Sequence, residues 1–459
     1  MADAERRKIQ GDLAFEAKLE GEARGRVEGR AEATVTGRGT ESPAETARLM
    51  EEVLAAENLR KALKRVRGNR GSAGVDGMSV TALPGYLKEH WPRIREELMA
   101  GRYKPKPVKR VQIPKPDGGE RGLGIPTVLD RFIQQALLQV LQPLWEPSFS
   151  DHSYGFRPGR SAHQAVARAQ GYIAEGHGIV VDMDLEKFFD RVNHDILMGL
   201  LMRRVADKRV LKLVRGYLNA GVLEDGLVRA VGEGTPQGGP LSPLLSNIVL
   251  NLLDKELEKR GHRFVRYADD CNVYVKSERA GQRVLESIGS FIGKKLRLKL
   301  NREKSAVGRP SERTFLGFSF TDGKEPKRRI APKALKRLKA RVTGLTRRTR
   351  GVSLERMIQE LAQFLIGWRG YFGHCQTPSV LKVLDGWIRR RLRSVLWKQW
   401  KRGRIRYAEL RSHGVGKQLS AKTAGSAHRP WRISKSPALS YALPNAFFTR
   451  LGLPSLAPG

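Results

Sequence analysis

Residues 264–275 read FVRYADDCNVYV, and this stretch decides how the rest of the chain is interpreted. Runs of β-branched and aromatic residues flank the acidic pair Asp269 and Asp270, which is the pattern of a strand, a tight turn and a second strand. Two adjacent carboxylates repel each other unless a cation neutralises them. Mg²⁺ binds carboxylate oxygens and leaves room for substrate phosphates. Because Asp also favours ordinary turns, the pair alone favours a solvated turn, and metal binding requires a partner carboxylate.

That partner can come from residues 179–190, which read IVVDMDLEKFFD and begin as a buried strand. Asp182 and Asp184 occupy alternate positions of this strand and therefore point to the same face. An acid at the end of a buried strand is costly unless it is paired or bound to a metal. Three converging carboxylates can hold two Mg²⁺ ions about 3.5–4 Å apart for an in-line phosphoryl displacement.

The net charge of +38 is the strongest global signal in the 459 residues. Residues 1–57 hold 9 Lys/Arg against 13 Asp/Glu, whereas residues 324–459 hold 31 against 5. A surplus this large and this uneven favours a nucleic-acid surface over a basic face kept for solubility.

Two other function classes are disfavoured by composition. The sequence contains no run of eighteen apolar residues and no apolar signal region, so neither a membrane span nor secretion is expected. Cys271 and Cys375 are the only cysteines, which is too few for a disulfide framework or a cysteine-based zinc site. Reduced thiols in a cytosolic protein are expected.

Before the first acidic strand, apolar spacing predicts helices over residues 48–66, 83–99 and 131–145. Between the last two lies a β-hairpin, with a strand at 108–114, a turn at 115–121 and a return strand from 122. Lys115 and Arg121 flank the turn. They are interpreted either as scattered surface charge or as groups that grip phosphates from a rigid arm.

Two further stretches have the composition of contact loops. Residues 154–163 read YGFRPGRSAH, and interleaved aromatics and arginines suit nucleic-acid contact, which makes Arg157 and Arg160 candidates. Residues 232–243 form a Gly- and Pro-rich loop before a long apolar helix at 244–257. Glycines there allow close approach of the backbone to a ligand. Gln237 could contact a nucleotide or template base, or the loop could serve only to start the helix.

The last third of the chain changes to basic helices, predicted over residues 333–349, 354–372 and 380–401. The third carries the arginine run Arg389, Arg390 and Arg391, which we take as further candidate nucleic-acid contacts. Residues 403–430 are predicted to be loop-rich, and an apolar segment follows at 438–453. Residues 1–45 have few large apolar residues, and a disordered or weakly helical segment is expected there.

Five motifs in order resemble reverse transcriptases, and together they are similar to the bacterial group II intron reverse transcriptase/maturase family. The motifs are the IPK…RGLGIP arm, YGFRPG, DLEKFFD, GTPQGGPLSP and YADD. The resemblance implies an α+β right-hand polymerase, with fingers, a palm built on an antiparallel sheet, and an α-helical thumb called domain X. The HNH endonuclease of longer members needs Cys and His positions that are missing here, so second-strand cutting is not expected.

The resemblance also implies domain boundaries. They are a disordered extension at 1–47, a helical extension of the fingers at 48–104, fingers and palm at 105–322, the thumb at 323–402, and a basic, DNA-binding-like tail at 403–459.

The resemblance places Asp184, Asp269 and Asp270 as catalytic Mg²⁺ ligands, with the carbonyl of Leu185 assisting. Asp184 is preferred by its spacing to the aromatic pair that follows, and Asp182 stays the alternative. Two Mg²⁺ ions are expected, with Mn²⁺ as a possible substitute.

The resemblance implies a nucleotide site as well. Lys115 and Arg121 match residues that hold the incoming triphosphate, and Phe189 matches the position that screens the sugar 2′ carbon. Gln237 matches a residue lining the pocket, and Lys304 lies in the motif whose lysine is thought to protonate the pyrophosphate.

The predicted function is therefore an RNA-directed DNA polymerase that also binds its intron RNA and assists splicing. Its expected partners are group II intron RNA, an RNA template, a DNA primer or target and deoxynucleotides, in a cytoplasmic, nucleoid-associated ribonucleoprotein without a membrane. The alternatives are a reverse transcriptase co-opted for phage defence or CRISPR adaptation, and a maturase that only assists splicing.

Overall fold

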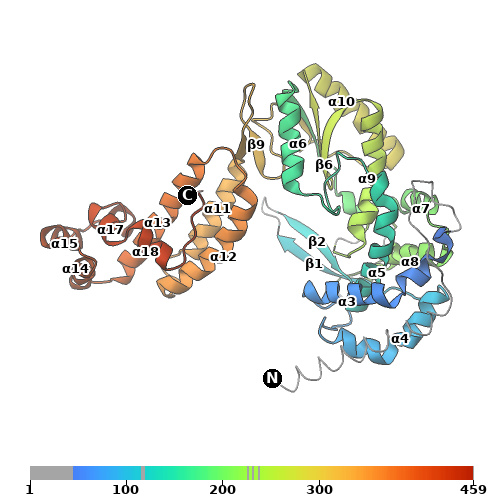
Figure 1. The fold of residues 1–459 in the computed structure, drawn as a ribbon, viewed down its shortest axis with the longest axis horizontal. Coiled ribbons are helices and arrows are strands. Elements are labelled where there is room, and N and C mark those ends of the chain that lie inside the picture. The colour runs from blue at the N-terminus through green and yellow to red at the C-terminus, as the bar shows by residue number, and fades with distance from the viewer. Residues whose placement is uncertain (1–44, 115–118, 225–226, 230–231, 236–237, 458–459) are drawn as a thin grey trace, which may run out of the picture. The chain divides into compact units, whose positions relative to one another are not determined.

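The computed structural model describes residues 45–457 apart from 115–118, 225–226, 230–231 and 236–237. The chain forms two compact units (Figure 1). The first contains residues 1–165 and 181–307, and the second contains residues 166–180 and 308–459. Among the described helices, none combines the length and apolar character needed to cross a bilayer.

The described part of the first unit begins with two separate helices rather than with one long helix. The prediction of a single helix over residues 48–66 is wrong, because the chain forms a short turn at Glu45–Arg48, then α2 (Leu49–Val53) and α3 (Ala56–Gly68). Ala55 is extended between them, and the side-chain amide of Asn58 donates to the Val53 carbonyl at 2.9 Å. This side-chain bond takes the place of a helical backbone bond at the break. The next helix, α4 (Leu83–Met99), is confirmed with the predicted bounds.

The first sheet contains the predicted basic hairpin, whose strands β1 (Val108–Pro114) and β2 (Glu120–Ile125) pair antiparallel. Its strand order is β2-β1-β4-β5, with β4 (Val222–Glu224) parallel to β1 and β5 (Leu227–Arg229) at the edge. The long helix α5 (Val128–Trp145) follows the hairpin. It packs against α3, where the Asn58 amide reaches the carbonyl of Ala136.

The second sheet carries the acidic segments and has the order β6-β7-β3-β8. Its strands are β3 (Ile179–Met183), β6 (Arg263–Tyr267), β7 (Asp270–Val275) and β8 (Ala306–Gly308). The predicted hairpin is confirmed, because β6 and β7 pair antiparallel with Tyr267 opposite Asp270.

The first unit contains further helices, which are, in chain order, the short η3 (Phe188–Asp190), α7 (His194–Met202), α8 (Lys208–Asn219), α9 (Ser242–Lys259) and α10 (Glu278–Phe291). Helix α6 (Ala162–Ala174) belongs to the second unit from residue 166 onward. A π-helical turn at Ile292–Leu296 ends α10. The long apolar helix predicted to follow the Gly- and Pro-rich loop is α9, which begins two residues earlier than expected and ends two residues later.

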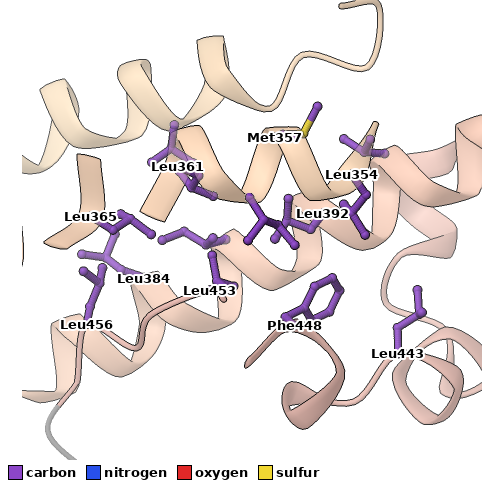
Figure 2. Packing of buried hydrophobic residues seen from close by; sticks show 14 of the residues in the cluster. Leu354, Met357, Leu361, Leu365, Leu384, Leu392, Leu443, Phe448, Leu453 and Leu456 are labelled. Carbon is purple, nitrogen blue, oxygen red and sulfur yellow. The ribbon is translucent and has the colours of Figure 1, made fainter. Parts of the chain in front are cut away.

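In the second unit, a small pair of strands, β9 (Phe318–Phe320) and β10 (Arg328–Ile330), precedes a helical region. The three predicted basic helices are confirmed as α11 (Pro332–Leu345), α12 (Leu354–Phe372) and α13 (Ser379–Gln399). Leucines of α12 and α13 meet across a shared apolar core (Figure 2).

The loop-rich prediction for residues 403–430 is wrong, because helices continue almost to the end of the chain. They are α14 (Gly403–Ser412), α15 (Lys417–Ala424), α16 (Pro430–Ile433), α17 (Pro437–Ala442) and α18 (Asn445–Arg450). Leu443, Phe448, Leu453 and Leu456 enter the same core as α12 and α13 (Figure 2). Burying one such side chain stabilises the fold by about 1.5–3 kcal/mol. The segment after residue 402 is therefore part of the core of the second unit.

Candidate active site

The acidic pair lies in the tight turn between β6 and β7. Ala268 adopts a left-handed conformation with φ of +56°, which reverses the chain directly before Asp269 and Asp270. Gly155 lies against this turn, and a Cβ at that position would collide with the backbone nitrogen of Ala268. Gly155, the first glycine of the YGFRPG motif, is therefore required for close packing against the acidic turn.

A buried arginine holds the turn in place, and sequence patterning alone does not mark it as part of the site. Arg266 and Asp254 form a fully buried ion pair in which Nε and Nη2 donate to the two carboxylate oxygens at 2.7 and 2.6 Å. The same guanidinium donates to the carbonyl of Ala268, to Asn247 Oδ1 and to Ser153 Oγ. A planar fork with five donors satisfies all of these acceptors at once, so Arg266 orders the backbone of the turn.

The third carboxylate is presented by the segment that follows β3. The Asp184 N–H donates to Ser305 Oγ at 3.0 Å, and its carbonyl accepts from the Asn301 N–H at 2.8 Å. Leu185 forms an isolated bridge with Leu300. Residues 300–305 thus fix the backbone from which Asp184 projects.

Negative charge is concentrated around Asp270. Burial, followed by the charges of Asp269, Asp182 and Asp184, raises the pKa of Asp270 to about 7, while Lys304 opposes the shift. Lys304 Nζ lies 3.4 Å from Asp184 Oδ2. The three predicted acids and Lys304 are therefore electrostatic neighbours, with more acidic groups than this lysine can balance.

Asp182 belongs to the same cluster but has an internal partner. With the Asn272 amide oriented to satisfy its neighbours, its nitrogen donates to Asp182 Oδ1 at 3.2 Å. Asp182 lies within β3, whereas Asp184 follows the end of that strand. This difference favours Asp184 as the acid available to a ligand.

The donor set matches a hard divalent cation in its chemistry. Within the described ranges, no three His, Cys, Asp or Glu side chains are already gathered tightly enough to enclose an ion. Asp184, Asp269 and Asp270 nevertheless offer only oxygen donors, which Mg²⁺ prefers, and the raised pKa of Asp270 shows that a nearby positive charge would relieve their repulsion. The residues present therefore fit a divalent metal.

Phe189 lines a groove in the same unit. Its ring packs edge-to-face against Phe188, and its carbonyl accepts from the Thr235 N–H at 2.6 Å. The groove, of about 630 Å³, is within the size range of small-ligand sites. Its polar and aromatic lining includes Arg65, Asn69, Arg131, Gln135, Phe156 and Phe189.

The other predicted nucleotide-binding residues cannot be placed in this groove. Lys115 and Gln237 lie outside the described residues. Arg121 belongs to β2, where its backbone pairs with Ile113, and only its backbone position is described.

The structure corrects the interpretation of Arg157 as a phosphate contact. Arg157 is only 8% exposed, pairs with Glu146 at 2.8 Å and donates to the carbonyls of Ser150 and Ser153. These bonds orient the YGFRPG loop from inside the protein. Arg160 lies nearer the surface and pairs with Asp151 at 2.6 Å.

The arginine run of α13 is also largely engaged within the protein. Arg390 stacks over Trp431 at 3.8 Å and donates to the Trp431 carbonyl. Arg391 donates to Thr346 Oγ1 and lies over the ring of Trp387. Arg390 and Arg391 thus join α13 to its neighbours, and nucleic-acid contact by Arg389, Arg390 and Arg391 stays a prediction.

Two known domain families match the chain. Residues 113–320 match "Reverse transcriptase (RNA-dependent DNA polymerase)", and residues 335–414 match "Group II intron, maturase-specific domain". The first match contains every predicted metal ligand, and the second covers most of the helical region from α11 to α14.

Curated relatives agree with these matches. Protein YkfC of Escherichia coli (strain K12) is 34% identical over 313 residues, which are 60% of this chain and 81% of that protein. Group II intron-encoded protein LtrA of Lactococcus lactis subsp. cremoris is 30% identical over 325 residues, which are 56% of this chain and 54% of LtrA. The chain thus spans about half the length of LtrA.

A solved structure, the partial Cas6-RT-Cas1–Cas2 complex, is similar at 22% identity with a TM-score of 0.36, over 58% of this chain and 46% of that one. A likeness this low supports no argument about function.

The acidic palm turn and the first family match define the class as an RNA-directed DNA polymerase. With the maturase-specific domain and the intron-encoded relatives added, the chain belongs to the group II intron reverse transcriptase/maturase family. The predicted fold class is confirmed as a reverse transcriptase domain with a mixed sheet, followed by a helical C-terminal region. Dependence on a divalent metal is general for this class of enzyme.

Proposed function

We propose that this chain copies group II intron RNA into DNA at the acidic turn, and that it binds the same RNA to assist splicing. The observation that carries the proposal is the cluster formed by Asp184, Asp269 and Asp270. In this cluster, burial and the neighbouring acids raise the pKa of Asp270 to about 7. Perturbed carboxyl groups of this kind are typical of functional sites. The maturase-specific match supports the intron RNA as the partner.

Asp184, Asp269 and Asp270 would hold two Mg²⁺ ions, assisted by the Leu185 carbonyl. Mg²⁺ held by these residues would supply the Lewis acidity needed to activate a primer 3′-hydroxyl and to stabilise the pyrophosphate leaving group. Arg266 keeps the acidic turn in place through its bond to the Ala268 carbonyl, so the two carboxylates need little reorganisation when substrate arrives.

Other residues of the chain would select and orient the nucleotide. The ring of Phe189 would form the wall that rejects a 2′-hydroxyl, and Lys115, Arg121 and Gln237 would contact the triphosphate and base. The ammonium group of Lys304, already 3.4 Å from Asp184 Oδ2, would supply a proton to the departing pyrophosphate.

The experiment is primer extension by the purified chain on a primed RNA template with deoxynucleotides and Mg²⁺. We expect cDNA synthesis that stops with a chelator and returns with added Mg²⁺. A chain that binds the template tightly but makes no cDNA under any divalent cation would contradict the polymerase assignment. It would leave splicing assistance as the function.

A further inference from the structure

A small cavity of about 20 Å³ lies between α5, α8 and the start of α9. It shares the lining residues Gly239 and Ser242 with the groove that contains Phe189. Its polar lining consists of Lys106, Asp130, Gln134, Tyr217, Thr235 and Ser242. None of these residues belongs to the acidic cluster. The cavity exceeds the roughly 10–15 Å³ that one buried water molecule requires.

Two hydroxyl groups in this lining lack a well-formed direct hydrogen bond among the described residues. Thr235 Oγ1 has no partner there, and the Tyr217 phenol makes only a weak hydrogen bond to Asp130. Thr235 and Tyr217 are only 2% and 6% exposed. Buried polar atoms are almost always satisfied by protein or by ordered water. The unsatisfied Thr235 hydroxyl, together with the weakly bonded Tyr217 phenol on the same small polar cavity, therefore points to a bound water molecule.

Asp130 makes the cavity strongly polar. Its carboxylate accepts from the Tyr103 hydroxyl at 2.9 Å, the Thr127 hydroxyl at 2.6 Å and the Lys106 N–H at 3.3 Å. Burial, followed by the charge of Asp130, raises the pKa of Tyr217 well above its usual value, so the phenol keeps its proton and can donate it. A water molecule beside these groups would find both donors and acceptors.

The backbone of Thr235 connects this cavity to the groove. Its N–H donates to the carbonyl of Phe189 at 2.6 Å, and the preceding Gly234 N–H donates to the carbonyl of Val192 at 2.7 Å. The Gly234 carbonyl in turn lies 2.6 Å from Nε2 of the buried His194. The backbone of Phe189 is therefore hydrogen-bonded to Thr235, which also lines the cavity.

We propose that the cavity binds an ordered water molecule bridging the hydroxyls of Thr235 and Tyr217, and that Thr235 thereby positions Phe189 for nucleotide selection. The positioning role rests on the proposed function, because it assumes that Phe189 faces the sugar of the incoming deoxynucleotide. Thr235 is a positioning residue that acts through its backbone bond to Phe189.

The functional test compares Thr235→Val, which replaces the hydroxyl with a methyl group of similar size, with Thr235→Ser, which keeps the hydroxyl. The Val variant removes the hydroxyl that binds the bridging water, so Thr235 and the attached Phe189 should be held less firmly. We expect KM for deoxynucleotides to rise about tenfold in this variant. We expect kcat to stay within about twofold, discrimination against ribonucleotides to fall, and the Ser variant to resemble the wild type. Equal defects in both variants, or a loss of kcat alone, would overturn the positioning role.

Tyr217→Phe provides the coupled test, because it removes the other hydroxyl of the same cavity. If one water molecule joins the two groups, the double variant with Thr235→Val should be little worse than the worse single variant. Fully additive effects would contradict a shared water molecule.

A crystal structure of the wild-type chain at high resolution tests the water site without reference to activity. We expect one ordered water molecule within hydrogen-bond distance of Thr235 Oγ1 and the Tyr217 hydroxyl, and its loss in the Val variant. An empty cavity, or a direct bond from Thr235 Oγ1 to another protein atom, would overturn the water site. Absence of polymerisation in the wild type would instead count against the proposed function.

Discussion

At the scale of single residues, the acidic turn depends on a side chain that sequence patterning could not identify. Arg266 lies in a strand where Phe264, Val265 and Arg266 are all buried, so the alternation that normally separates inside from outside does not apply. Its partner Asp254 comes from α9, and only the folded chain brings the two together. Removing one member of a buried ion pair typically costs about 3–5 kcal/mol, because an uncompensated charge is left behind.

The choice between Asp182 and Asp184 can be made with two isosteric variants. Asp184→Asn should reduce primer extension by roughly 100-fold or more, the scale expected when charge stabilisation of a transition state is lost. Asp182→Asn should cost less than about tenfold, since Asn272 already donates to Asp182. Single-nucleotide extension rates at saturating Mg²⁺ measure both, and the reverse order of effects would make Asp182 the ligand.

The site residues that sequence patterning could propose are those recognisable from residue type and order alone. An acid pair between two strands and an acid after a buried strand could be recognised locally, and the structure brings them together. Arg157 could not be judged in this way, because its partner Glu146 and the carbonyls that surround it are set by tertiary packing.

At the scale of elements, the last segment of the chain is held by one buried acid on α13. Asp385 accepts hydrogen bonds from Ser455 Oγ and from the backbone N–H groups of Leu456 and Ala457. These bonds hold Leu456 in the apolar core shown in Figure 2. The sequence pattern did not predict this connection, because it depends on a contact across about seventy residues.

Asp385→Ala should lower the free energy of unfolding by about 2–4 kcal/mol, because several buried donors lose their acceptor at once. Asp385→Asn, which keeps one acceptor oxygen, should lose less. The exposed Lys382→Ala on the same helix serves as the matched control, and urea unfolding monitored by tryptophan fluorescence measures all three. Equal stability of the Asp385→Ala and Lys382→Ala variants would contradict the anchoring role.

The helices after residue 402 also show where periodicity fails. Each of them spans ten residues or fewer, so at most three apolar residues per helix enter the core, and in α14 only Leu410 is fully buried. Such short segments are marginal as isolated helices and form because the core receives them. In a longer amphipathic helix such as α12, the apolar spacing repeats often enough to predict the helix from sequence. The predicted bounds of α12 are those observed.

At the scale of the whole molecule, the excess of basic residues and the proposed metal-binding acids lie in different parts of the chain. Residues 324–459 carry 31 Lys/Arg against 5 Asp/Glu, whereas all three proposed metal ligands precede residue 271. Phosphate contacts dominate the affinity of proteins for nucleic acids, so loss of the acids should leave RNA binding largely unchanged. This separation makes it possible to test catalysis without disturbing binding.

The most direct measurement is cDNA synthesis on a primed RNA template by the double variant Asp269→Ala with Asp270→Ala, alongside RNA affinity under the same conditions. Extension should be abolished while RNA affinity stays close to that of the wild type, and Asp322→Ala, which removes one exposed acid, should behave like the wild type in both assays. Normal extension by the double variant would contradict the assignment of the acidic turn as the polymerase site.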